Sequence, residues 1–277
     1  MKNIHAAIGA IVLLTSAAFA QADIHSVDFK NFTYAPFCIS DEAENVTVKD
    51  GEFSRETQED GYVDRYYFSV FGISYGDLNG DGRDEAVVLA SCNTGGTGNF
   101  SEGFVYKMAA GKPVLAARIP GGDRAYGGLH AARVENGLLV VESNDVGEMG
   151  GACCPEFRIT TRYKLVGGKI VQQGAARRAE LYPSTRVTFA RGTSGTTMKV
   201  RIDANDLKRF VVGARAGQTL DVSVNSDKAS IRILEEADVS EGANSLRARL
   251  SKNGDYTIEV QNLDEDPIEV TLKVQIN

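Results

Sequence analysis

The segment Ile268-Glu269-Val270-Thr271-Leu272-Lys273-Val274-Gln275-Ile276 alternates apolar and polar residues from end to end. Successive side chains of a β-strand point to opposite faces, so this alternation predicts a strand that buries one face and exposes the other. Upstream segments repeat the pattern: Met198–Ile202, Phe210–Ala214, Leu220–Val224, Leu246–Leu250 and Tyr256–Val260. A period of two in so many short segments is typical of antiparallel sheets with one buried face. We therefore predict an antiparallel β-sandwich over residues 185–277.

Three stretches of this region resemble the PPC-type β-sandwich, namely Arg186–Ser194, Arg209–Val224 and Gly254–Val260. Within that group the layout is similar to the periplasmic inhibitors of g-type lysozyme, and the match covers nearly all of residues 184–277. The resemblance implies a protein partner such as a g-type lysozyme. Members of that family enter the lysozyme cleft with a Ser-Gly-x-Tyr loop. The matching positions here are Asn253, Gly254, Asp255 and Tyr256.

The chain departs from that family at two places. Asn253 stands where the family has serine, and the acidic segment Asn262–Pro267 replaces a basic one. Because lysozymes are typically cationic, the acidic segment could steer the encounter with a partner. We favour the alternative that Asp264–Asp266 keep a loop solvated. Tyr256 begins an alternating strand, so we also favour a place in the core over a partner contact.

Residues 174–184, with Arg177-Arg178 and Pro183, are expected to form a linker. The region before it, residues 21–173, consists of apolar runs and tight turns. Asp50-Gly51, Asn136-Gly137 and Gly167-Gly168 each supply the positive φ of a two-residue hairpin. We predict a β-meander domain here.

This domain contains one acidic loop, Asp77-Leu78-Asn79-Gly80-Asp81-Gly82-Arg83-Asp84-Glu85. Oxygen-bearing side chains stand at positions one, three, five and nine, which is a pattern that wraps a hard cation. An EF-hand needs a glutamate at the twelfth position of its loop. That position here is Val88, so an EF-hand is excluded. The loop resembles the calcium loops of FG-GAP repeats, which implies side-chain ligands from Asp77, Asn79, Asp81 and Glu85 and the carbonyl of Arg83. We expect a structural Ca²⁺ ion; the alternative is a plain turn.

The wider run from Tyr75 to Ala86, with cysteines on either side, resembles the exported LppP/LprE-type bacterial domains. That resemblance covers about half of the mature chain and implies a fold rather than a chemistry.

The four cysteines of an exported chain predict two disulfides. A bond between the neighbours Cys153 and Cys154 is strained, so we expect each of them to pair with one of Cys38 and Cys92. A metal or redox site is the alternative. It is disfavoured because the chain has no Cys-x-x-Cys motif.

Three glycine-rich loops interrupt the domain: Asn93–Asn99, Gly121–Gly128 and Gly147–Gly151. They do not open a helix as phosphate-binding loops do. One interpretation is a shallow ligand site surrounded by Asp123, Arg124, Tyr126 and Asp145. We favour the other, that these loops are plain connections.

Near the N-terminus, Lys2 precedes an apolar run from Ile8 to Leu14 and the small-residue ending Ala18-Phe19-Ala20. This pattern predicts a signal peptide over residues 1–20, cleaved near Ala20, and a periplasmic or secreted protein. No later segment has the roughly 20 apolar residues of a membrane span. The formal net charge of −7 argues against nucleic acid as a partner and permits a cationic one.

Catalysis is not expected. Only His25 and His130 follow the signal peptide, no Gly-x-Ser-x-Gly elbow occurs, and Gly192–Gly195 lacks the strand–helix setting of a nucleophile. No spacing selects a pair of carboxylates.

Together, these patterns predict a mainly β protein with a disulfide-tied N-terminal domain and a C-terminal PPC-like sandwich. We expect a lysozyme inhibitor-like binding protein. The alternatives are a general PPC-type accessory module of the cell envelope and an uncharacterised secreted hydrolase.

Overall fold

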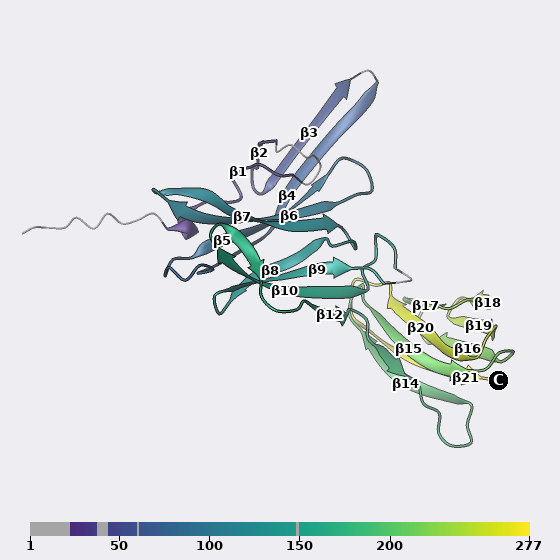
Figure 1. The fold of residues 1–277 in the computed structure, drawn as a ribbon. Helices are drawn as coiled ribbons and strands as arrows, with labels where there is room; N and C mark the ends of the chain where they lie inside the picture. The colour runs from purple at the N-terminus through teal and green to yellow at the C-terminus, as the bar shows by residue number, and fades with distance from the viewer. Residues whose placement is uncertain (1–22, 38–43, 60, 148–149) are drawn as a thin grey trace, which may run out of the picture.

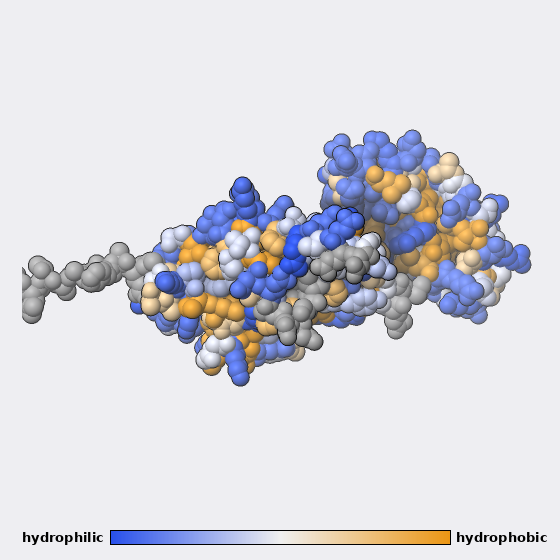
Figure 2. All heavy atoms as spheres, turned by 90° about the horizontal axis from the view of Figure 1, so that it is seen from above, coloured by the Kyte–Doolittle hydropathy of each residue, from blue (hydrophilic) through white to orange (hydrophobic). Residues whose placement is uncertain are grey.

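The computed structural model describes residues 23–37, 44–59, 61–147 and 150–277. The chain is mainly β and forms two bodies that follow each other along the sequence (Figure 1). The space-filling view shows them as two lobes, on which hydrophilic residues alternate with smaller hydrophobic patches (Figure 2). The described residues contain no helix with the length and hydropathy of a membrane span.

The first sheet of the N-terminal domain is antiparallel and follows the sequence order β3-β4-β5-β6-β7. Its strands are β3 (Glu52–Glu59), β4 (Tyr62–Gly76), β5 (Glu85–Asn93), β6 (Phe100–Ala109) and β7 (Lys112–Asp123). Because each strand pairs with its neighbour in sequence, this sheet is the meander that the turn pattern predicted.

The second sheet has the order β11-β10-β9-β8, and β12 also pairs with β10. Its strands are β8 (Leu129–Glu135), β9 (Leu138–Asp145), β10 (Phe157–Val166), β11 (Lys169–Gln172) and β12 (Arg177–Glu180). The hairpin turn between β8 and β9 is Asn136-Gly137, with φ of 52° and 73°. Gly167-Gly168 joins β10 to β11 in the same way, with φ of 57° and 77°. The third predicted turn, Asp50-Gly51, has φ of 53° and 88° and is closed by a single antiparallel bridge between Lys49 and Glu52. All three predicted turns are confirmed.

Strand β5 is buried on both faces because each face packs against a different layer. Alternate residues, such as Val87 and Leu89, lie between the two sheets, with Leu139 of β9 on the opposite side. The other face packs under the segment from η1 (Ile24–Ser26) through β1 (Thr33–Tyr34) to β2 (Val46–Thr47). That second core is rich in aromatic residues: Phe29, Tyr34, Tyr66, Phe68, Phe104 and Tyr106.

The C-terminal domain is a sandwich of two sheets, as the alternating segments predicted. One sheet has the order β13-β15-β20-β17, with β13 (Ser184–Arg186), β15 (Leu207–Ala214), β20 (Gly254–Asn262) and β17 (Ala229–Ile233). The other has the order β14-β21-β16-β19-β18, with β14 (Gly195–Ile202), β21 (Ile268–Ile276), β16 (Thr219–Val224), β19 (Ser245–Leu250) and β18 (Ala237–Gly242). The short strand β13 departs from the antiparallel pattern, since it lies parallel to β15.

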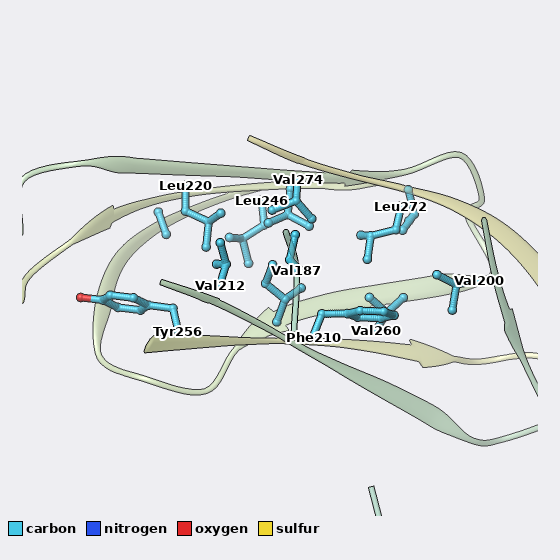
Figure 3. Close-up of a cluster of buried hydrophobic side chains, with 14 of the residues drawn as sticks. Val187, Val200, Phe210, Val212, Leu220, Leu246, Tyr256, Val260, Leu272 and Val274 are labelled. Carbon is cyan, nitrogen blue, oxygen red and sulfur yellow. The ribbon is translucent and has the colours of Figure 1, made fainter. Parts of the chain in front are cut away.

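The apolar residues of both sheets face one another in a single core (Figure 3). Strand β19 shows the predicted alternation most clearly, because its residues are exposed and buried in strict turn. In β21 Val270, Leu272 and Val274 are at most 1% exposed. The period of two therefore places these side chains in the core.

Polar contacts join the two domains across the segment that was expected to be a linker. Strand β12 lies within that segment and belongs to the second sheet of the N-terminal domain. Leu181 follows β12 directly, and its N–H donates to the carbonyl of Glu156 at 2.9 Å. The first part of the segment is therefore fixed to the N-terminal domain.

The sandwich contacts the same place from the other side. The guanidinium of Arg209 on β15 reaches the carboxylate of Glu156 at 3.3 Å. The ring of Tyr182 lies 5.4 Å from the same guanidinium. The second part of the segment enters β13, which pairs with β15. Residues 174–184 are thus held at both ends.

The predicted disulfide pairing is wrong, because Cys153 and Cys154 are bonded to each other. They lie in a tight turn that is closed by the N–H of Cys154 and the carbonyl of Gly151 at 2.9 Å, and both are exposed. Cys92 is disulfide-bonded and 1% exposed, and it faces the aromatic core. Its neighbour Ser91 points to the other face of β5, where Cys153 lies, so Cys153 cannot reach Cys92. Cys38 lies outside the described residues.

Candidate functional site

Two turns lie side by side at one end of the sandwich, and we call residues 215–218 and 251–255 the two-turn tip. The first turn joins β15 to β16, and the second joins β19 to β20. The N–H of Gly217 donates to the carbonyl of Leu250 at 2.8 Å, and the N–H of Leu250 donates to the carbonyl of Gln218 at 2.9 Å. The backbone of one turn thus holds the other.

Asn253 adds a side-chain link between the two turns. Its Oδ1 accepts the N–H of Ala216 at 3.0 Å. Asp255 follows at the start of β20 and pairs with Arg186 of β13 at 2.6 Å, with both side chains more than half exposed. This ion pair raises the pKa of Arg186. The tip therefore presents the amide of Asn253 and the carboxylate of Asp255, and the guanidinium of Arg186 on the neighbouring strand pairs with that carboxylate.

Tyr256 supports the tip from inside the sandwich. The residue is 0% exposed, and Figure 3 shows its ring at the edge of the core with the oxygen pointing away from the other side chains. That oxygen accepts the N–H of Lys252 at 3.1 Å and donates to the carbonyl of Lys252 at 3.0 Å. Tyr256 is thus a core residue that shapes the turn, in agreement with its position in an alternating strand.

Gly254 has a φ of 148°, which side chains with a Cβ rarely adopt, and open space surrounds it. Backbone conformation therefore favours glycine here. Positions 253–256 were identified from the sequence, whereas Ala216 and Arg186 were not. Both of these residues come from turns or strands that are distant in sequence, so no local pattern pointed to them.

The acidic segment 262–267 lies at the opposite end of β20 from the tip. Nine residues of strand separate the two ends by roughly 30 Å. Asn262 is buried, and its amide donates to the carbonyls of Asp203 at 3.0 Å and Asp266 at 2.8 Å. Asp264 pairs with Lys228 at 2.5 Å, and that contact lowers the pKa of Asp264. These contacts support a structural loop.

The acidic loop 77–85 closes on its own backbone. Asp77 accepts the N–H groups of Gly80 at 2.6 Å and Gly82 at 2.9 Å, which lowers its pKa. Glu85 is 1% exposed, and its Oε2 accepts the N–H of Leu78 at 2.9 Å. Burial raises the pKa of Glu85, and the nearby carboxylates of Asp81 and Asp77 add to that effect.

These donors are chemically suited to Ca²⁺, since they combine carboxylates with the amide of Asn79 around a buried negative charge. In the described parts of the chain, however, no three acidic, histidine or cysteine side chains are grouped as a metal site. The loop keeps its shape through hydrogen bonds, and the ion stays a prediction.

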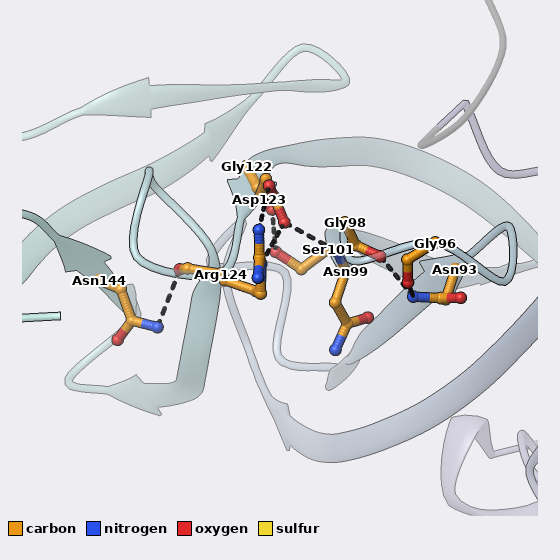
Figure 4. Close-up of polar contacts among 9 residues, drawn as sticks. All are labelled: Asn93, Gly96, Gly98, Asn99, Ser101, Gly122, Asp123, Arg124 and Asn144. Carbon is orange, nitrogen blue, oxygen red and sulfur yellow. Dashed lines mark hydrogen bonds and ion pairs between the residues drawn. The ribbon is translucent and has the colours of Figure 1, made fainter. Parts of the chain in front are cut away.

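Two of the glycine-rich loops, Asn93–Asn99 and Gly121–Gly128, meet in the N-terminal domain, where only part of the predicted ligand set comes together. The third loop lies partly outside the described residues. Asp123 and Arg124 form a two-pronged ion pair at 3.0 and 3.3 Å, and Asp123 also accepts the N–H of Asn99 at 2.8 Å (Figure 4). Asp145 instead pairs with Arg178 at 2.7 Å, and Tyr126 is 55% exposed.

Comparison with protein-family profiles gives no match, and comparison with curated proteins gives none either. Among solved structures, the chain is similar to PliG of Aeromonas hydrophila, a periplasmic lysozyme inhibitor of g-type lysozyme, at 21% identity and a TM-score of 0.31. That match covers 34% of this chain and 96% of PliG. PliG of Salmonella Typhimurium matches at 16% identity and a TM-score of 0.30, over 34% of this chain and 97% of that one.

A third similar structure is an exo-β-1,3-galactanase of Phanerochaete chrysosporium, at 12% identity and a TM-score of 0.23. It covers 85% of this chain and 71% of the galactanase. At these identities and TM-scores, the matches assign neither a family nor an activity to the chain.

Proposed function

We propose that this chain is an exported, non-enzymatic binding protein that acts on a cell-wall lytic enzyme through its two-turn tip. The observation that carries the proposal is the hydrogen bond from the N–H of Ala216 to the side chain of Asn253, which joins two exposed turns. A binding segment that is already ordered loses less conformational entropy when a partner is bound. The first partner to test is a g-type lysozyme, because the tip coincides with the loop positions identified from the sequence.

The charge of the chain supports a cationic partner. Its formal net charge is −7, which attracts a basic protein over long distances. This attraction belongs to the whole chain. The acidic segment 262–267 lies at the far end of the sandwich and is tied into its own loop, so we do not assign it to the contact.

We further propose that the N-terminal domain is an accessory body stabilised by Ca²⁺. Asp77, Asn79, Asp81 and Glu85 would hold the ion with side-chain oxygens, and Arg83 would hold it with its carbonyl. A bound cation would offset the buried charge of Glu85 and fix the connection between β4 and β5.

Calorimetric titration of a g-type lysozyme with the mature chain tests the binding site. Asp255→Ala removes an exposed carboxylate from the tip, and Glu265→Ala removes one from the opposite end of the same sandwich. We expect Asp255→Ala to weaken binding about tenfold, or about 1.4 kcal/mol, and Glu265→Ala to leave it unchanged. Equal affinities of the two variants for the lysozyme would show that the tip takes no part in the contact.

A general accessory module of the cell envelope is the alternative function. It predicts no binding to any lysozyme while the chain stays folded. A secreted hydrolase would instead show turnover of a cell-wall substrate by the purified chain.

A further inference from the structure

A cavity of about 470 Å³ lies in the N-terminal domain, outside the two-turn tip. Its wall includes Phe71, Ser91, Asn99, Arg124, His130 and Cys153. These residues come from β4, β5, the glycine-rich loops, β8 and the turn that holds the Cys153–Cys154 disulfide. We propose that this cavity binds a short neutral saccharide.

Arg124, the charged residue in the cavity wall, is already paired with Asp123. Both nitrogens of Arg124 that face Asp123 are bound to its carboxylate. That carboxylate also accepts the N–H of Asn99, and these contacts lower its pKa. Burial and the nearby Arg158 lower the pKa of His130, which favours its neutral imidazole. A charged ligand would therefore meet no free opposite charge on these residues.

The cavity wall is held in place by internal hydrogen bonds. The hydroxyl of Ser101 accepts the N–H of Leu129 at 2.7 Å and donates to the carbonyl of Gly122 at 3.1 Å. The amide of Asn144 donates to the carbonyl of Arg124 at 3.0 Å, and its oxygen accepts from Arg158 at 2.5 Å. A wall of this kind is largely formed before a ligand arrives.

Neutral polar groups and apolar surface are available to a ligand. Asn99 is exposed, and Figure 4 draws no bond from its side-chain amide to the other eight residues shown. The imidazole of His130 can both donate and accept. Phe71 is 45% exposed, and the disulfide adds apolar surface to the same cavity.

This combination matches a sugar. The C–H face of a sugar ring packs on an aromatic ring, while its hydroxyl groups both donate and accept hydrogen bonds. A cavity of about 470 Å³ is within the usual range for small ligands. The cavity and the two-turn tip lie in different domains, so sugar binding is independent of the proposed lysozyme contact.

Titration of the mature chain with tri-N-acetylchitotriose, cellotriose and maltotriose, followed by NMR, tests the proposal. We expect saturable binding of at least one of them, and the preferred sugar separates amino-sugar glycans from glucans. Phe71→Ala and Asn99→Ala should each weaken that binding about tenfold. Tyr62→Ala is the matched control, because it removes an aromatic side chain that is 81% exposed on the β3–β4 hairpin.

Absence of binding for all three sugars would overturn the proposal. So would binding that Phe71→Ala and Asn99→Ala leave unchanged while both variants keep the wild-type spectrum. Displacement of the bound sugar by inorganic phosphate would also contradict the proposal, because the cavity would then select an anion.

Discussion

At the scale of single residues, side chains near the proposed sites act by fixing backbone. Tyr256 binds both backbone groups of Lys252, and Asn253 binds the N–H of Ala216. Asp123 similarly joins Asn99 to Arg124. The sequence could identify Tyr256 as a core residue from its strand period. It could not reveal which backbone groups these side chains bind, because those contacts depend on how the turns fold and meet.

Tyr256→Phe tests this role of the tyrosine hydroxyl. The variant keeps the ring in the core but leaves the backbone of Lys252 without its side-chain partner. We expect a loss of about 1–2 kcal/mol in the free energy of unfolding, measured with urea. An unchanged free energy of unfolding would show that the hydroxyl does not stabilise the turn.

Asp123→Asn tests the ion pair at the glycine-rich loops and its dependence on pH. The pKa of Asp123 is lowered in the folded chain, so its contribution is present above the unfolded value of about 3.9 and is lost as pH falls through the folded value. We expect the variant to be about 1 kcal/mol less stable at pH 7. The difference should shrink below pH 4. A difference that is constant with pH would contradict this account.

At the scale of elements, the sequence predicted the strands and their hairpin turns well, and the disulfide pairing and the segment 174–184 poorly. The alternation in β19 and β21 and the hairpin at Asn136-Gly137 follow from local geometry, and the structure confirms them. The Cys153–Cys154 bond could not be predicted from spacing, because the choice of partner depended on which face of β5 carries Cys92. Strand β12 was missed because it is short and mostly exposed.

Calcium binding by the acidic loop is tested by thermal unfolding with excess Ca²⁺ and with chelator. Binding to the folded state alone raises the unfolding midpoint. At a Ca²⁺ concentration a hundredfold above Kd, the free energy of unfolding rises by about 2.7 kcal/mol. We expect Glu85→Gln to lose that increase, because it removes the buried carboxylate. Asp50→Asn, which changes an exposed carboxylate at another turn, is the control. A wild-type unfolding midpoint that is the same with excess Ca²⁺ and with chelator would contradict the ion site.

At the scale of the whole molecule, a buried charge lies beside the junction of the two domains. Glu259 is 1% exposed and binds Arg209 at 3.0 Å and Arg232 at 2.5 Å. Arg209 also reaches Glu156 of the N-terminal domain. One arginine thus links the sandwich sheet to the other body.

Arg209→Ala should be costly because it leaves the buried carboxylate of Glu259 with one arginine. We expect a loss of about 3 kcal/mol in the free energy of unfolding, measured with urea. Lys199→Ala breaks the exposed pair with Glu269 and should cost less than about 1 kcal/mol. Similar losses in the free energy of unfolding for the two variants would show that burial of Glu259 does not make the loss of its partner more destabilising.

As a whole, we propose, the chain binds and restrains a cell-wall lytic enzyme. The most direct measurement is the rate at which g-type, i-type and c-type lysozymes clear a bacterial suspension in the presence of stoichiometric mature chain. We expect a lower lytic rate for the g-type enzyme, and a partial return of that rate when the chain carries Asp255→Ala, because the variant binds about tenfold more weakly. Unchanged lytic rates for all three enzymes would contradict this function.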